Sequence, residues 1–132
     1  MLSDLGTVVQ SKRLDDFEPV STIEIFTADK AEKCAMEFRA QQWKLTSQGF
    51  LVHPASGMVL TASILNKKEV ALGKKITENE SDLQKWDLTE ACTLQNRYTK
   101  YVLAVKGGKK KAGERVWMKK SGKGAAFQWS FA

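Results

Sequence analysis

The stretch Gln41-Gln42-Trp43-Lys44-Leu45 decides the fold, because the chain repeats it twice more at one fixed interval. The second copy is Gln84-Lys85-Trp86-Asp87-Leu88 and the third is Phe127-Gln128-Trp129-Ser130-Phe131. Successive tryptophans are 43 residues apart. A fixed period of this length marks one supersecondary unit that is used several times. We therefore divide the 132 residues into three units, at about residues 1–45, 46–88 and 89–132.

Short β-branched stretches recur at matching places in these units and predict strands. Leu60 and Leu103 each stand 26 residues before a tryptophan, and Val70-Ala71-Leu72 matches Val116-Trp117-Met118. Glycine-containing turns separate these stretches. The complete second unit is expected to hold four strands, over residues 49–52, 57–62, 69–72 and 83–88.

Two segments have some helical character, and one strand has no counterpart. Residues 29–40 are rich in helix formers, and residues 77–85 fit one capped turn. Nothing before Gly6 corresponds to the first strand of the second unit. The sequence therefore predicts an irregular first unit, or a chain cut from a longer protein.

The period of 43 residues fits two all-β architectures. Propeller blades have a similar length, and Trp86-Asp87 spells the dipeptide of one propeller family. Propellers need about four to eight blades, however, and three blades cannot close such a ring. The other tryptophans are followed by Lys44 and Ser130, so the dipeptide is not repeated. Three four-stranded units of roughly 43 residues in one domain over residues 1–132 predict a β-trefoil.

A Gln-x-Trp phrase that closes each of three units resembles the signature of the ricin B-type lectin family, whose fold is a β-trefoil. The first two phrases match it, whereas Phe127 replaces the glutamine of the third. The segment Ser56-Gly57-Met58-Val59-Leu60-Thr61 is also similar to the family's second-strand motif, and the resemblance covers residues 6–131. It implies structural roles in the core for Trp43, Trp86, Trp129, Gln41 and Gln84.

The resemblance also implies where a sugar would bind. An active repeat of the family has an aspartate after the second strand, an aromatic platform after the third, and an asparagine before Gln-x-Trp. The aspartate positions here are Gln10, Thr61 and Ala104, the platform positions are about Phe26, Gly73 and Lys119, and the asparagine positions are Ala40, Leu83 and Ala126. No unit keeps the full set, and a site that recognises hydroxyl groups fails without its polar partners. Gln10 and Phe26 remain candidates for a non-standard sugar site.

One segment carries the whole excess of positive charge. Residues 106–124, which we call the basic hairpin, hold eight basic residues and only Glu114 as an acid, whereas the net charge of the chain is +6. A hairpin there would form a patch that attracts anionic partners. Trp117 alternates with Val116 and Met118, so we expect it on the opposite face of its strand. The candidate binding residues are Lys106, Lys109, Lys110, Lys111, Arg115, Trp117, Lys119, Lys120 and Lys123.

No arrangement of residues indicates catalysis, a metal or a cofactor. His53 is the single histidine, and Cys34 and Cys92 lack the paired spacing of a zinc site. These two cysteines fall in different units, which favours reduced thiols and a cytoplasmic location. No apolar run approaches the roughly 18 residues of a membrane helix, and the first residues do not resemble a secretory signal.

The sequence therefore predicts a non-catalytic, ricin B lectin-like binding module. Its expected partner is acidic, such as a protein tail, a phosphoinositide or another polyanion, held by the basic hairpin. Nucleic acid is a weaker candidate because no recognised nucleic-acid motif accompanies the patch. The alternative is a carbohydrate-binding lectin with a non-standard site, either near Gln10 and Phe26 or at Trp117. Electrostatic binding falls steeply with salt, whereas stacking on a sugar hardly responds.

Overall fold

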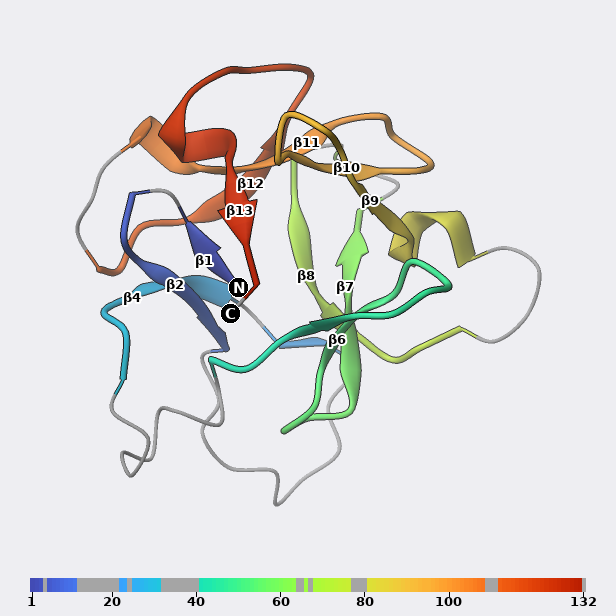
Figure 1. The fold of residues 1–132 in the computed structure, drawn as a ribbon. Coiled ribbons are helices and arrows are strands. Elements are labelled where there is room, and N and C mark those ends of the chain that lie inside the picture. Colours follow the sequence, from blue (N-terminus) through green and yellow to red (C-terminus); the bar gives the residue numbers. More distant parts are fainter. Residues whose placement is uncertain are drawn as a thin grey trace.

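The strands of this chain form three antiparallel sheets in the computed structural model, which describes residues 1–3, 5–11, 22–23, 25–31, 41–63, 66, 68–76, 81–108 and 112–131. The strands are β1 (Leu2–Ser3), β2 (Val8–Ser11), β3 (Thr22–Ile23), β4 (Ile25–Ala28), β5 (Lys44–Leu45), β6 (Leu51–His53), β7 (Met58–Ala62), β8 (Val70–Gly73), β9 (Trp86–Leu88), β10 (Leu94–Asn96), β11 (Val102–Val105), β12 (Val116–Lys119) and β13 (Trp129–Ser130) (Figure 1). Three 3₁₀ turns complete the described elements, η1 (Ser81–Gln84), η2 (Lys106–Gly108) and η3 (Ala125–Phe127).

The four strands predicted for the second unit are confirmed as β6, β7, β8 and β9. The last of them is shorter than predicted, because Leu83 and Gln84 belong to η1 and the strand begins only at Trp86. The turn at η1 agrees with the single turn expected there, for the part that is described. Of the helical segment expected over residues 29–40, Asp29 to Ala31 are not helical and residues 32–40 lie outside the described part.

The strand that begins at or directly after each repeated tryptophan pairs with the first strand of the next unit. This rule joins β5 to β6 and β9 to β10, and it joins β13 back to β1. The last pairing closes the molecule, because Leu2 lies opposite Ser130 and Ser3 lies opposite Trp129. The two chain ends accordingly lie side by side in Figure 1. The predicted absence of a first strand in the first unit is therefore wrong, since β1 fills that place.

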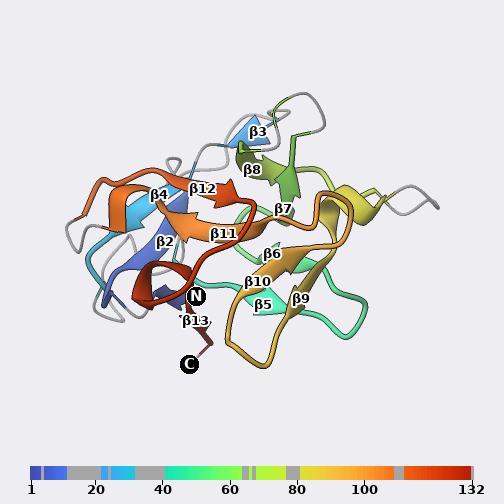
Figure 2. The same ribbon diagram turned by 90° about the horizontal axis from the view of Figure 1, so that it is seen from above.

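The turns between the second and third strands of each unit form another set of links. Thr27 N in β4 donates to Glu114 O, and Met118 N in β12 donates to Lys68 O, both at 2.9 Å. In the same manner β3 pairs with β8, with Thr22 opposite Gly73. Each unit therefore contacts both others through its backbone, and Figure 2 shows the three groups of strands arranged around one centre. This layout confirms the predicted three-unit β-trefoil.

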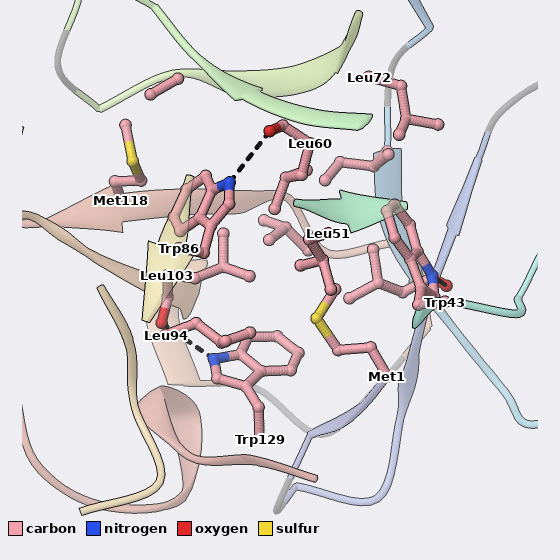
Figure 3. Packing of buried hydrophobic residues seen from close by; sticks show 14 of the residues in the cluster. Met1, Trp43, Leu51, Leu60, Leu72, Trp86, Leu94, Leu103, Met118 and Trp129 are labelled. Carbon is pink, nitrogen blue, oxygen red and sulfur yellow. Dashed lines mark hydrogen bonds between the residues drawn. The ribbon is translucent and has the colours of Figure 1, made fainter. Parts of the chain in front are cut away.

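The core lies between the three units and contains the three repeated tryptophans (Figure 3). Trp86 and Trp129 are almost fully buried, and Trp43 is 9% exposed. Each indole Nε1 donates to a backbone oxygen of the second strand in its unit. The acceptors are Val9 O at 2.9 Å, Leu60 O at 3.0 Å and Leu103 O at 3.1 Å, for Trp43, Trp86 and Trp129 respectively. Each of these tryptophans thus combines apolar burial with one directional hydrogen bond. The bond fixes the position of the last strand of each unit relative to the second strand of the same unit.

Candidate functional site

Gln84 uses its whole amide to hold the second unit together. Its Nε2 donates to Lys74 O at 2.7 Å and to Thr61 Oγ1 at 3.2 Å, and its Oε1 accepts a bond from Ile76 N at 2.8 Å. Thr61 stands at the position that the resemblance assigns to a sugar-binding aspartate. The Thr61 hydroxyl, which accepts the bond from Gln84, also donates a bond to Val59 O at 3.0 Å. Both its donor and its acceptor capacity are therefore used within the fold.

Gln41 repeats this pattern in the first unit. Its Nε2 donates to Asp29 O at 2.9 Å and to Gln10 Oε1 at 2.8 Å, and its Oε1 accepts from Ala31 N at 2.8 Å. Gln10, a candidate sugar ligand, is therefore buried and bonded to the scaffold. Phe26 lies opposite Gln10 in the register of β2 and β4, and its side chain is outside the described part.

The third unit replaces the glutamine amide with a ring. Phe127 packs against Gly122, where a Cβ atom would overlap the phenyl ring. Gln128, one residue later, makes only a 3.3 Å bond to Ala91 O. Ala104, at the aspartate position, is fully buried and Ala126 precedes the ring. None of the three units has a carboxylate at the position that the resemblance assigns to the aspartate.

Trp117 is the tryptophan that the core does not use. Val116 and Met118 on either side of it are buried in the core, and Trp117 lies half-buried on the outer face of β12. This is the orientation that strand alternation predicts. Its neighbour across the sheet is Ala104 on β11. The small side chain of Ala104 leaves space for the large indole on that face.

Three exposed lysines place their ammonium groups over the Trp117 ring. Their Nζ atoms lie 5.3 Å (Lys106), 5.6 Å (Lys68) and 5.8 Å (Lys119) from the ring centroid. These distances are within the cation–π range of about 6 Å. Trp117, Lys68, Lys106 and Lys119 come from two units, and we call them the Trp117 cluster.

Among the described residues, the acid next to the cluster in the chain is engaged elsewhere. Glu69 lies next to Lys68 in the chain, but its carboxylate pairs with Arg115 at 3.5 Å. Both of those side chains are about half exposed, so the ion pair contributes at most about 1 kcal/mol. Within the described residues, no ion pair involves any of the three lysines of the cluster.

The indole N–H of Trp117 is buried, and no described residue accepts a bond from it. Buried tryptophan N–H groups usually find a partner. A buried donor without one costs about 1–3 kcal/mol of stability. The N–H of Trp117 is therefore a buried polar group that the described part of the fold leaves unsatisfied.

The structure places part of the predicted basic hairpin at the Trp117 ring, together with Lys68 from outside the hairpin. Lys106 and Lys119 lie at the Trp117 ring, and the predicted residues Arg115, Lys120 and Lys123 are exposed. Lys109, Lys110 and Lys111 lie outside the described part. Lys68 was missed by the sequence analysis, because it belongs to the second unit and reaches Trp117 only through the backbone bond from Met118.

His53 and Cys92 are the remaining candidates that the structure describes. His53 is buried, with its ring 4.9 Å from that of Trp43 and its Nδ1 2.8 Å from Ser56 Oγ. Cys92 is exposed with a free thiol, and Cys34 is not among the described residues. In the described ranges, no group of three or more histidine, cysteine or acidic residues is placed to hold a metal. No described helix is long and apolar enough to cross a membrane.

Comparison with known proteins identifies the family. A family profile described as "Ricin-type beta-trefoil lectin domain-like" matches residues 39–118. The match covers more than half of the chain and includes the first two Gln-x-Trp phrases. The chain therefore belongs to the ricin-type β-trefoil lectin domain-like family. A search of curated proteins found no significant match.

Solved structures with the same fold include proteins with bound sugars. The C-terminal half of an earthworm R-type lectin, in complex with GalNAc, has a TM-score of 0.74 at 18% identity, over 96% of this chain and 91% of that one. The designed three-fold symmetric protein ThreeFoil has a TM-score of 0.75 at 18% identity, over 97% and 92%. The β-trefoil lectin of the Vibrio vulnificus hemolysin/cytolysin, with N-acetyl-D-lactosamine bound, has a TM-score of 0.62 at 16% identity, over 94% and 90%. At these identities the likeness establishes the fold.

Proposed function

We propose that this chain is a non-catalytic, carbohydrate-binding lectin domain whose site is the Trp117 cluster. The observation that carries the proposal is the contrast among the four tryptophans. Three are buried and bonded to backbone oxygens, whereas Trp117 is half-buried on an outer face with its N–H unpaired. A partly exposed indole offers a flat apolar surface for the C–H face of a sugar ring.

Family membership supports this proposal over the acidic protein or phosphoinositide partner. The similar structures described above include two lectins with bound sugars, and they offer no support for binding to acidic proteins or lipids. Because the standard sugar-binding residues of the family are absent, a sugar would bind at a different place on this chain, the Trp117 cluster. Gln10 and Thr61 are held by Gln41 and Gln84, so they contribute to the scaffold.

An acidic partner remains a second candidate, because the lysines around Trp117 have no acidic partner of their own among the described residues. Such a partner would bind through charge alone, and its affinity would fall steeply with salt. The two candidates therefore differ in what they require from the indole ring. A sugar site needs the ring, whereas a purely electrostatic patch keeps most of its affinity without it.

The test is a glycan array probed with the intact chain and with Trp117→Ala. Tyr98→Ala is the matched control, because Tyr98 is an aromatic residue that is 56% exposed at the turn between β10 and β11. We expect glycan binding by the wild-type chain and by Tyr98→Ala, and its loss in Trp117→Ala. Trp117→Phe keeps an aromatic ring and should retain part of the affinity, which separates loss of the platform from loss of the fold. An empty array, or binding that is unchanged in Trp117→Ala, would refute the proposal.

A further inference from the structure

We infer that the saccharide bound at the Trp117 cluster is anionic and carries sulfate or carboxylate groups. This inference rests on the proposed function and adds to it the chemical class of the ligand. It comes from the three ammonium groups that lie within 5.8 Å of the ring centroid, which a neutral sugar does not need.

The three ammonium groups are close enough to act together. Each Nζ lies within 5.8 Å of one centroid, so no two of them are more than about 11 Å apart. The Debye length at physiological ionic strength is about 8 Å, so their potentials overlap even in salt. Their mutual repulsion falls when an anion binds among them. The empty cluster therefore has an electrostatic preference for a negatively charged ligand.

The neighbouring acid does not remove this preference. Glu69 pairs with Arg115 at 3.5 Å, so its carboxylate offsets the charge of that guanidinium group. The positive charges of the three lysines in the cluster are left in place. Lys120, which follows Lys119 directly, is exposed and adds positive charge at the end of β12. The positive charge consequently extends beyond the Trp117 ring along the end of β12. Such a surface suits an oligosaccharide with several anionic groups.

The geometry assigns different tasks to the ring and to the lysines. The indole supplies a stacking surface. Each ammonium supplies up to three donors on a flexible stem, and hydrogen bonds to an ionised acceptor are the stronger kind. Flexible stems tolerate different positions of the sulfate or carboxylate around the sugar. We expect the site to select for negative charge on a sugar more strictly than for one particular linkage.

The experiment compares the same oligosaccharide with and without its charges. The probes are a chondroitin sulfate oligosaccharide, its chemically desulfated and carboxyl-reduced form, and neutral N-acetyllactosamine. Affinities are measured by titration calorimetry with the intact chain at low and at moderate salt. We expect the anionic form to bind at least about tenfold more tightly than the neutral form, which corresponds to about 1.4 kcal/mol. We also expect this difference to shrink as salt rises.

Matched charge variants locate the effect. Lys68→Gln, Lys106→Gln and Lys119→Gln together should abolish the preference for the anionic form and leave the weak neutral binding that Trp117 supports. The control combines Lys30→Gln, Lys44→Gln and Lys74→Gln, which remove the same charge from exposed positions elsewhere. The control should keep the preference, which rules out an effect of net charge alone.

The outcomes separate this inference from the proposed function. Equal binding of charged and neutral forms, unchanged by the cluster variant, would overturn the anionic specificity and leave the lectin function standing. Absence of binding to every saccharide would overturn both. Polyglutamate and phosphoinositide vesicles serve as anions without the saccharide. Suppose that either anion binds as tightly as the sulfated oligosaccharide, and that Trp117→Ala weakens the binding of neither the anion nor the oligosaccharide. The ligand is then recognised by charge alone, and both proposals fail.

Discussion

The ring of Phe127 occupies the space that a side chain at Gly122 would need. Gly122 stands four residues after Met118, as Ile76 stands four residues after Leu72 in the second unit. In that unit the residue two before the tryptophan is Gln84, and its amide bonds to the backbone of Ile76. The third unit thus keeps the same contact with a different chemistry, since aromatic packing on a glycine replaces a hydrogen bond.

This pairing predicts that Gly122→Ala destabilises the chain by about 1–3 kcal/mol, because a methyl group there overpacks the phenyl ring. Phe127→Ala should remove the clash, so the double variant should be less destabilised than the sum of the two single changes. Urea unfolding of the four proteins gives the coupling free energy, which we expect to be at least about 1 kcal/mol. Additive effects would show that the ring does not lie against residue 122.

Gln84 and Gln128, which precede the repeated tryptophans of the second and third units, should differ sharply in their contribution to stability. Gln84→Leu leaves Lys74 O and Ile76 N without their partner, and we expect a loss of about 2–3 kcal/mol in the free energy of unfolding. Gln128→Leu removes one long bond at a partly exposed position and should stay within about 0.5 kcal/mol of the wild type. Equal effects in denaturant unfolding would contradict the assigned roles.

Replacing two tryptophans by phenylalanine distinguishes a core residue from a surface residue. Trp86→Phe creates a cavity and orphans Leu60 O, so we expect a loss of about 2–4 kcal/mol. Trp117→Phe breaks no hydrogen bond within the described structure and should cost less than about 1 kcal/mol. Thermal unfolding followed by circular dichroism measures both. A large loss in Trp117→Phe would mean that the indole serves the fold.

The amino group of Met1 gives the 132-residue chain a predicted dependence on pH. Burial lowers the pKa of this group from 8.0 to about 6. Between these two values the unfolded chain binds more protons than the folded chain, so stability should rise as pH increases from about 6 to about 8. Acetylation of the amino group should remove this part of the pH dependence. The check is a set of denaturant unfolding curves across that range, for both forms of the chain.

The repeated tryptophans were sufficient to predict the β-trefoil, because one buried ring per unit sets the period of the whole fold. The first strand could not be predicted in the same way. Leu2 and Ser3 are too few to show an alternating pattern, and their pairing with β13 joins residues at opposite ends of the chain. Such a pairing depends on tertiary structure and leaves no local mark in the sequence.

The candidate site was predictable in part. Alternation on one strand placed Trp117 on the outer face, and the charge of the segment drew attention to Lys106 and Lys119. Lys68 is 49 residues away in the chain, and it reaches the ring because the turn between β7 and β8 bonds to β12. Gln10 shows the opposite case. Its position suggested a sugar ligand, and only the structure reveals that Gln41 holds its oxygen.

The pairing of β1 with β13 has a consequence for how the chain can be cut and rejoined. Since the two ends lie in one sheet, a short peptide linking them would leave every strand pair in place. New ends can then be opened at the turn between β6 and β7, where Pro54 and Gly57 are exposed. Such a circularly permuted chain is expected to fold to the same β-trefoil with the Trp117 cluster intact. In this architecture the fold depends on the order in which the three units follow one another around the core. It does not depend on the unit from which the chain starts.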